Sequence, residues 1–131
     1  MVFSQIVQNQ DMNWKTIRLE LGRTSEFPRG SPSRCYLLRL PLHPSGLIDG
    51  EALRASPGRA TVSRFWPSQP DMFGHVLKGS KGWAFTYIPT RGDETTFWPE
   101  AHSIRVGEHI TLLELDGQRL PFRVTSLSEL N

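Results

Sequence analysis

Two strand-like segments flank the dipeptide Asp116-Gly117 near the end of the chain, and no other feature constrains the fold as strongly. Asp-Gly between alternating apolar residues is the strongest short-range signal for a two-residue β-hairpin, because both turn positions need a positive φ. Alternate residues from Ile110 to Glu114 share one face before the turn. Alternate residues from Leu120 to Val124 share one face after it. This pattern predicts a protein built from antiparallel strands.

Pro121 interrupts the second strand of this hairpin. A proline has no N–H to donate to a neighbouring strand, so it is confined to sheet edges and bulges. We therefore expect a free strand edge near Pro121, and a homo-oligomer that pairs through this edge is one way to cover it.

Further strand patterns occur along the chain, each bounded by Gly, Pro or polar residues. They cover residues Lys15–Leu21, Cys35–Leu42, Thr61–Trp66, Phe73–Lys78 and Trp83–Ile88. Residues 23–34 and 89–96 have loop composition, and Asp49 is placed to cap one short helix that ends before Pro57. This organisation predicts a mainly β fold: a small antiparallel β-barrel or sandwich of about six to eight strands with one short helix.

The chain has 131 residues, which is close to the commonest size of a single domain. Residues 1–13 are rich in Gln and Asn, so we expect a poorly ordered leader and one compact β domain over residues 14–131. No apolar run is long enough to span a membrane, and the first residues lack the pattern of a signal peptide. The single cysteine, Cys35, fits a reducing compartment. These features predict a cytoplasmic protein that does not associate with membranes.

The sequence lacks a nucleophile elbow, a phosphate loop and a dinucleotide fingerprint. His75, His102, His109 and Cys35 are the obvious metal ligands, but their spacings match no familiar zinc pattern. We therefore expect no metal, no cofactor and no acyl-transfer activity.

Four predicted strands each carry an arginine at an interior position, and the formal net charge is +2. Arginine binds phosphate and carboxylate groups with a planar fork of donors and also stacks on aromatic rings. If Arg64 lies beside Trp66, the two side chains form a basic and aromatic surface like those with which small barrels hold single-stranded nucleic acid. The binding candidates are Arg18, Arg64, Trp66, His75, Trp83, Tyr87, His102 and Arg123. A simpler interpretation has the arginines paired with acidic cross-strand neighbours, and the rings of Trp66, Trp83 and Tyr87 in the core.

Six segments together resemble an uncharacterised family of small bacterial proteins. They are Lys15–Leu21, Arg64–Pro67, Trp83–Tyr87, Val106–Ile110, Asp116–Gly117 and Phe122–Val124. The likeness spans most of the chain after Trp14, and the leader before it is an addition to the family pattern. The resemblance implies a bacterial cytoplasmic protein with one compact domain. Since the family has no assigned activity, it implies no catalytic residue.

The sequence favours a binding or interaction module for an anionic ligand or single-stranded nucleic acid over an enzyme. Its pocket would combine the Arg64 strand, the Trp83 strand and the loop over residues 23–34. Two alternatives stay open. One is a small-barrel enzyme with His75 or His102 as acid or base and an arginine as stabiliser. The other is a structural subunit of a homo-oligomer.

Overall fold

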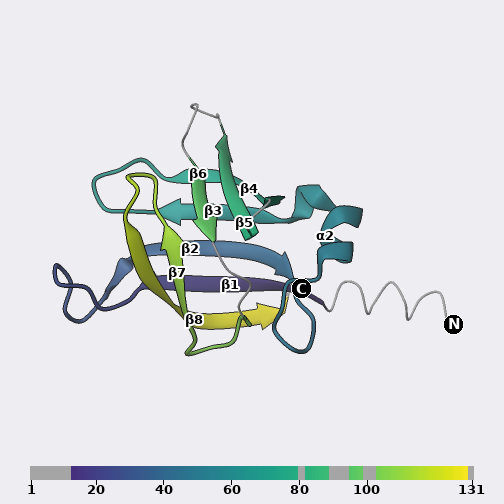
Figure 1. Ribbon diagram of the computed structural model, residues 1–131, viewed down its shortest axis with the longest axis horizontal. Helices are drawn as coiled ribbons and strands as arrows, with labels where there is room; N and C mark the ends of the chain where they lie inside the picture. Colours follow the sequence, from purple (N-terminus) through teal and green to yellow (C-terminus); the bar gives the residue numbers. More distant parts are fainter. Residues whose placement is uncertain (1–12, 80–81, 89–94, 99–102, 130–131) are drawn as a thin grey trace, which may run out of the picture.

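In the computed structural model, residues 13–79, 82–88, 95–98 and 103–129 are described, and they form a barrel of antiparallel strands (Figure 1). The strands are β1 (Trp14–Leu21), β2 (Ser31–Pro41), β3 (Thr61–Phe65), β4 (Met72–Gly79), β5 (Gly82–Ile88), β6 (Thr95–Trp98), β7 (His109–Leu113) and β8 (Arg119–Glu129). The predicted mainly β class is confirmed.

The strands pair in the order of the chain, and β8 pairs with β1 to close the barrel. Every pairing is antiparallel, as the hairpin signal predicts. Closure is narrowest between β6 and β7, where one residue pair, Phe97 with Leu113, joins the two strands. The pairing of β1 with β8 is extensive and runs from Lys15 opposite Glu129 to Leu21 opposite Phe122.

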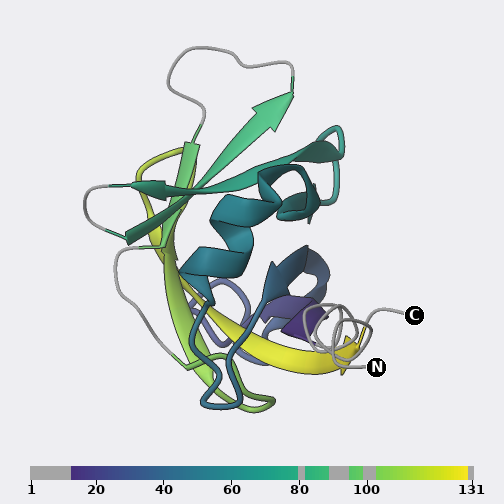
Figure 2. The ribbon, with the colours of Figure 1, turned by 90° about the vertical axis from the view of Figure 1, so that its right-hand side faces the viewer.

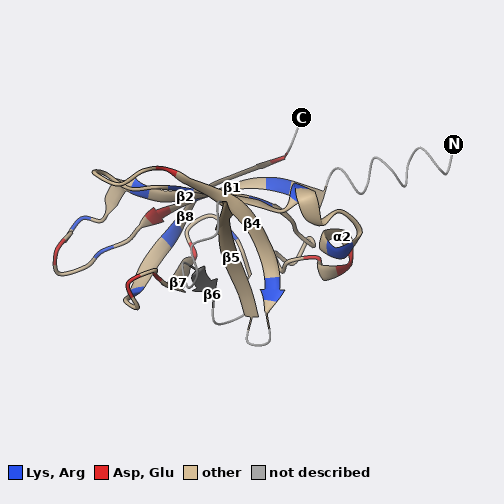
Figure 3. Ribbon diagram, turned by 90° about the horizontal axis from the view of Figure 1, so that it is seen from above, with Lys and Arg blue, Asp and Glu red and all other residues tan. Residues whose placement is uncertain are grey.

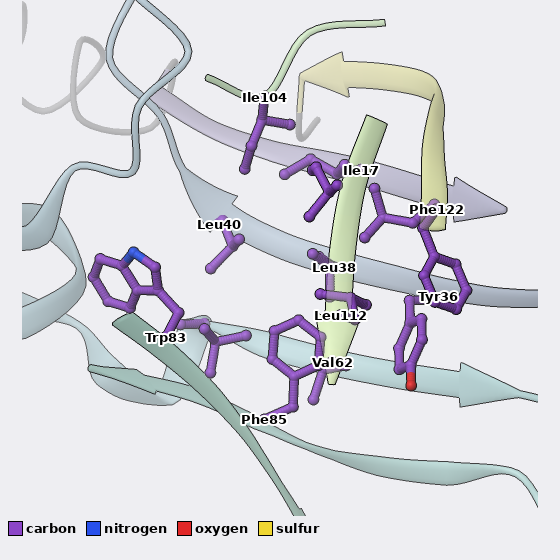
Figure 4. Packing of buried hydrophobic residues seen from close by; sticks show 14 of the residues in the cluster. Ile17, Tyr36, Leu38, Leu40, Val62, Trp83, Phe85, Ile104, Leu112 and Phe122 are labelled. Atoms are coloured by element: carbon purple, nitrogen blue, oxygen red, sulfur yellow. The ribbon is translucent and has the colours of Figure 1, made fainter. Parts of the chain in front are cut away.

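The inside of the barrel is filled by the apolar residues that alternate along each strand (Figure 4). Successive strand side chains point to opposite faces, so one face of each strand supplies the core. The buried residues include Ile17 and Leu19 of β1, Leu38 of β2, and Phe122 and Val124 of β8. Burial of this apolar surface is the main favourable contribution to folding.

The helix α2 (Gly50–Ala55) lies at one end of the barrel, and the β1–β2 loop lies at the other (Figures 1 and 2). Asp49 caps α2 as predicted, because its Oδ1 accepts a hydrogen bond of 3.1 Å from the backbone N–H of Ala52. Leu53 of α2 packs into the core, and a 3-10 turn, η1 (Pro57–Arg59), follows. In the part of the chain that the structure describes, no helix is long and apolar enough to cross a membrane.

The expectation of a free strand edge near Pro121 is wrong, because β8 pairs with β1 on one side and with β7 on the other. Pro121 faces Thr111 of β7, and its carbonyl accepts a 2.8 Å hydrogen bond from the N–H of Gly22 on the β1 side. The last β1–β8 pair is Leu21 with Phe122, so the ring nitrogen of Pro121 falls just beyond the β1 ladder, and no ladder hydrogen bond is lost. Strand pairing through this edge therefore gives no route to a homo-oligomer.

Two predicted loops are shorter than expected. The strand β2 begins at Ser31 rather than Cys35, although its pairing with β1 jumps from Ser31 to Cys35. The intervening residues 32–34 bulge out of the ladder, which explains their loop-like composition. The second loop was expected over residues 89–96, but residues 95–96 belong to the strand β6. The rest of that loop, and the leader apart from Asn13, lie outside the described residues.

Gly74 sits where β4 passes closest to β5. A Cβ atom at this position would lie 1.8 Å from the carbonyl oxygen of Thr86, which is backbone and cannot move aside alone. The position therefore requires glycine.

We expect Gly74→Ala to lower the free energy of unfolding by about 3 kcal/mol or more, since β4 and β5 must separate to admit the methyl group. Urea unfolding followed by tryptophan fluorescence measures this change. Gly58→Ala is the matched control, because nothing lies within 4 Å of its Cβ position. This control should leave stability unchanged or raise it by up to about 1 kcal/mol. Equal effects of the two substitutions would contradict the assignment.

Candidate functional site

The end of the barrel opposite α2 holds a pocket of about 240 Å³, which we call the mouth. The mouth lies between the β1–β2 loop, the end of β3 and the β7–β8 turn. Its lining includes the charged and aromatic side chains of Phe27, Arg34, Arg64, Trp66 and Glu114. The sequence hypothesis paired Arg64 with Trp66, and the two are in contact: the guanidinium carbon of Arg64 lies 4.2 Å from the centre of the Trp66 ring. This cation–π contact forms at the mouth rather than on the outer surface.

Arg64 points into the barrel, where it is 4% exposed and every guanidinium nitrogen is engaged. Its Nη2 donates to Oε1 of Glu114 at 3.1 Å, and its Nε donates to the hydroxyl of Tyr36 at 3.2 Å. Its Nη1 donates to Oε1 of Gln69 at 2.9 Å. Tyr36 in turn donates to Oε2 of Glu114 at 2.5 Å. Both carboxylate oxygens of Glu114 are therefore occupied, and we call these residues the Arg64–Glu114–Tyr36 network.

Burial controls the protonation of this network. It raises the pKa of Glu114, although the hydrogen bond from Tyr36 and the charge of Arg64 oppose the rise. It also raises the pKa of the Tyr36 hydroxyl well above its ordinary value, so Tyr36 stays a neutral donor. Burial lowers the pKa of Arg64, but Tyr36 and Glu114 outweigh it and raise that pKa overall. Arg64 therefore stays charged and forms an ion pair with Glu114.

Arg34 places a second guanidinium group near the Trp66 ring. The Cζ of Arg34 is 4.1 Å from the centre of the Phe27 ring and 5.9 Å from that of Trp66, and its Nη1 donates to Ser31 Oγ at 3.0 Å. Rings and guanidinium groups thus alternate at the rim. The stack fastens the β1–β2 loop to the barrel, because Phe27 belongs to that loop and Trp66 follows β3.

The mouth is a poor site for an anion, which corrects the pocket predicted around Arg64. Its two arginines face three carboxylates, those of Glu26, Glu114 and Asp116, and each guanidinium nitrogen of Arg64 already donates to a neighbouring side chain. Buried charges are tolerated when they are paired in this way. The Arg64 network is therefore a structural feature of the barrel, and replacing Arg64 would disturb the fold as well as any binding.

A larger groove of about 540 Å³ lies on the outer surface, beside the β1–β2 loop and β8. Arg23 and Arg29 of the loop, His109 of β7 and Arg123 of β8 line it together with one acidic residue, Glu20 of β1. We call this the basic groove. Figure 3 shows two basic segments in the β1–β2 loop and another on β8. Arginines on two separate elements thus face one open channel.

The arginines of the basic groove are available to a ligand. Arg23, Arg29 and Arg123 are exposed, and within the described ranges none makes an ion pair or a side-chain hydrogen bond. Glu20 lies opposite Arg123 in the β1–β8 pairing, but its Oε2 accepts instead from Nε of Arg18 at 2.8 Å. Arg18 also donates to the carbonyl of Pro32 at 3.1 Å. The groove therefore keeps an uncompensated positive charge.

The structure divides the predicted candidates among several places. Arg18 and Arg123 lie at the basic groove, and Arg64 and Trp66 lie at the mouth. Trp83 and Tyr87 are buried in the core, and Figure 4 shows Trp83 beside Leu40, away from Tyr36. Neither Trp83 nor Tyr87 lines the mouth or the basic groove. His75 lies on the outer face of β4, and His102 is outside the described residues.

Sequence reasoning missed several residues of these sites. Glu114 carried a usable signal, because it shares the face of Ile110 and Leu112, where a carboxylate needs a buried partner. The prediction included the loop over residues 23–34 but did not single out Arg23 and Arg29, because no periodicity describes the path of the loop. Among the described residues, no three His, Cys, Asp or Glu side chains gather as metal ligands.

Comparisons with protein-family models, curated proteins and solved structures find no match for this chain. The resemblance to an uncharacterised bacterial family therefore stays a prediction, and the functional argument rests on the geometry described above.

Glu114→Leu should lower the free energy of unfolding by about 3–5 kcal/mol, because it leaves the buried Arg64 charge without its acceptor. The double variant Arg64→Met with Glu114→Leu should recover most of this loss, since it removes the stranded charge as well. Urea unfolding of both variants measures the difference. A double variant as unstable as the single one would show that the loss does not come from Arg64.

The raised pKa of Glu114 predicts a specific pH dependence. The folded protein holds the Glu114 proton more tightly than the unfolded chain, so this contribution to stability is fully present below the ordinary carboxyl pKa of about 4.3 and is lost as the pH rises through the folded pKa. The unfolding free energy of the wild type, minus that of Glu114→Gln, should therefore fall as the pH rises. Unfolding titrations across this range measure it, and a difference that increases with pH would contradict the assignment.

Proposed function

We propose that this protein is a cytoplasmic binding module for single-stranded nucleic acid, and that it holds the phosphates in the basic groove. One observation carries the proposal: Arg23, Arg29 and Arg123 surround the groove without acidic partners among the described residues, while Arg18 engages the one carboxylate there. Phosphate groups are natural ligands for guanidinium forks, which bind them through two parallel hydrogen bonds.

The shape of the groove favours an extended chain over a compact anion. Small-molecule sites are concave and fix their ligand with a few converging polar groups. Here the arginines lie apart, two on the β1–β2 loop and one on β8, and all of them are exposed. Spaced and solvated cations of this kind suit a chain of regularly repeated phosphates.

The two pockets also meet in a way that suits a single strand. Leu21, at the end of β1, lines both the mouth and the basic groove, and the β1–β2 loop separates them. One side of the loop presents Arg23 and Arg29, and the other presents Phe27. Cationic side chains next to aromatic ones are the usual surface for single strands on small barrels.

Binding to a fluorescently labelled oligonucleotide of roughly ten nucleotides, followed by anisotropy over a series of salt concentrations, tests the proposal. Three phosphate contacts should give a slope of log K against log salt of about −2. Arg29→Gln and Arg123→Gln should each reduce the magnitude of this slope by about 0.7.

Arg54→Gln is the matched control, because it removes the same charge from α2 at the far end of the barrel and should leave the slope unchanged. Three outcomes would overturn the proposal. They are no binding by the wild type at about 50 mM salt, an effect of Arg54→Gln equal to that of Arg29→Gln, and inorganic pyrophosphate binding as tightly as the oligonucleotide.

A further inference from the structure

An apolar patch on the outer face of β2 to β5 is not explained by the basic groove. Phe73 of β4 is 53% exposed and Ile88 of β5 is 63% exposed. Cross-strand pairing places them in one row, which runs from Leu37 of β2 through Ser63 of β3 to Phe73 and Ile88. A shallow depression of about 360 Å³ lies over this row. We call these residues, with Phe65, the stacking face.

The ring of Phe73 is held in place although half of it is exposed. It packs edge-to-face against Phe65, with ring centres 6.3 Å apart and an angle of 82° between the rings. Edge-to-face packing fixes the orientation of an aromatic ring. An exposed ring of fixed orientation is the surface on which a nucleobase stacks, because every base has a flat π face.

The polar residues around the depression also suit a single strand. Arg39 and His75 line it together with Thr61, and no carboxylate is among the described residues that do so. Arg39 is exposed and makes no ion pair with any described residue. A phosphate next to a stacked base would therefore find a cation and no repelling charge.

Neighbouring strands connect the stacking face to the basic groove. Arg18 of β1 lies opposite Leu37 in the row that leads to Phe73, and Glu20 lies opposite Arg123 of β8. From β8 to β4 the surface crosses β1, β2 and β3, a path of roughly 19 Å at about 4.8 Å per strand spacing. A strand of several nucleotides covers such a path.

We propose that a nucleobase of the bound strand stacks on Phe73, with its neighbouring phosphate at Arg39, and that the strand runs from the basic groove across β1, β2 and β3 to this face. This inference rests on the proposed function, because it assigns a further subsite to the same ligand. Stacking of this kind accepts any base, so Phe73 contributes affinity rather than sequence preference.

The test compares Phe73→Ala with Phe73→Tyr, which keeps the ring, using anisotropy with oligonucleotides of roughly three and roughly ten nucleotides. We expect Phe73→Ala to weaken binding of the longer strand about 5- to 150-fold, which is the range for loss of one stacked base. The salt slope should not change, because no phosphate contact is lost. Phe73→Tyr should bind as the wild type does, and the short strand should not respond to either substitution.

Val106→Ala is the control for loss of exposed apolar surface elsewhere, since Val106 is 60% exposed and belongs to neither site. Wild-type binding with the expected salt slope but no effect of Phe73→Ala would overturn this inference and leave the proposed function standing. Failure of the wild type to bind would overturn both. A change in oligomer mass on Phe73→Ala, with unchanged oligonucleotide binding, would identify the patch as a contact between subunits and overturn the inference.

Discussion

The barrel is organised around a buried ion pair that crosses its interior. Arg64 comes from β3, Tyr36 from the adjacent β2, and Glu114 from the residue directly after β7. Transfer of two charges out of water is costly, and their attraction offsets that cost only when the remaining donors and acceptors are also satisfied. Here Tyr36 occupies the second carboxylate oxygen, and Gln69 accepts from the remaining guanidinium nitrogen. A shift of β3 or of the β7–β8 turn by one residue would break all of these bonds, so the network ties strands on opposite sides of the barrel to one register.

Because strand side chains alternate between the two faces of the sheet, some arginines point into the barrel and others point outward. On β3 this alternation directs Arg64 inward, where a carboxylate neutralises it, and on β8 it directs Arg123 outward, where no described acidic side chain pairs with it. The net charge of the chain is only +2, yet three exposed arginines, Arg23, Arg29 and Arg123, meet at one groove. The sign of the local field therefore depends on the arrangement of charges and not on their sum. This is why composition alone favours an anionic partner only weakly.

Most of the fold was predictable because it depends on local signals. Asp116-Gly117 indicates the hairpin, Asp49 indicates the helix cap, and alternation identifies the buried faces of β1, β5 and β8. The candidate sites were less predictable, because they combine residues from elements far apart in the chain. Nothing near Arg64 in the sequence indicates Glu114, which lies fifty residues away. The path of the β1–β2 loop, which brings Arg23 and Arg29 towards Arg123, depends on packing of Phe27 against Arg34 and has no period to detect. The strand β6 was missed for a different reason, since it is only four residues long.

The order of the strands has a consequence for synthesis on the ribosome. Each strand from β2 onward pairs with the one made just before it, so hairpins can form as the chain emerges, but β1 must wait for β8, the last of these eight strands to be translated. Until then β1 has one open side, and the barrel around Tyr36 and Arg64 is not closed. The pairing of β1 with β8 joins the strands that are farthest apart in the sequence, so it has the largest loop entropy, and it completes the burial of the network. The nascent chain therefore holds the charge of Arg64 in an incompletely closed core until β8 has been made and pairs with β1.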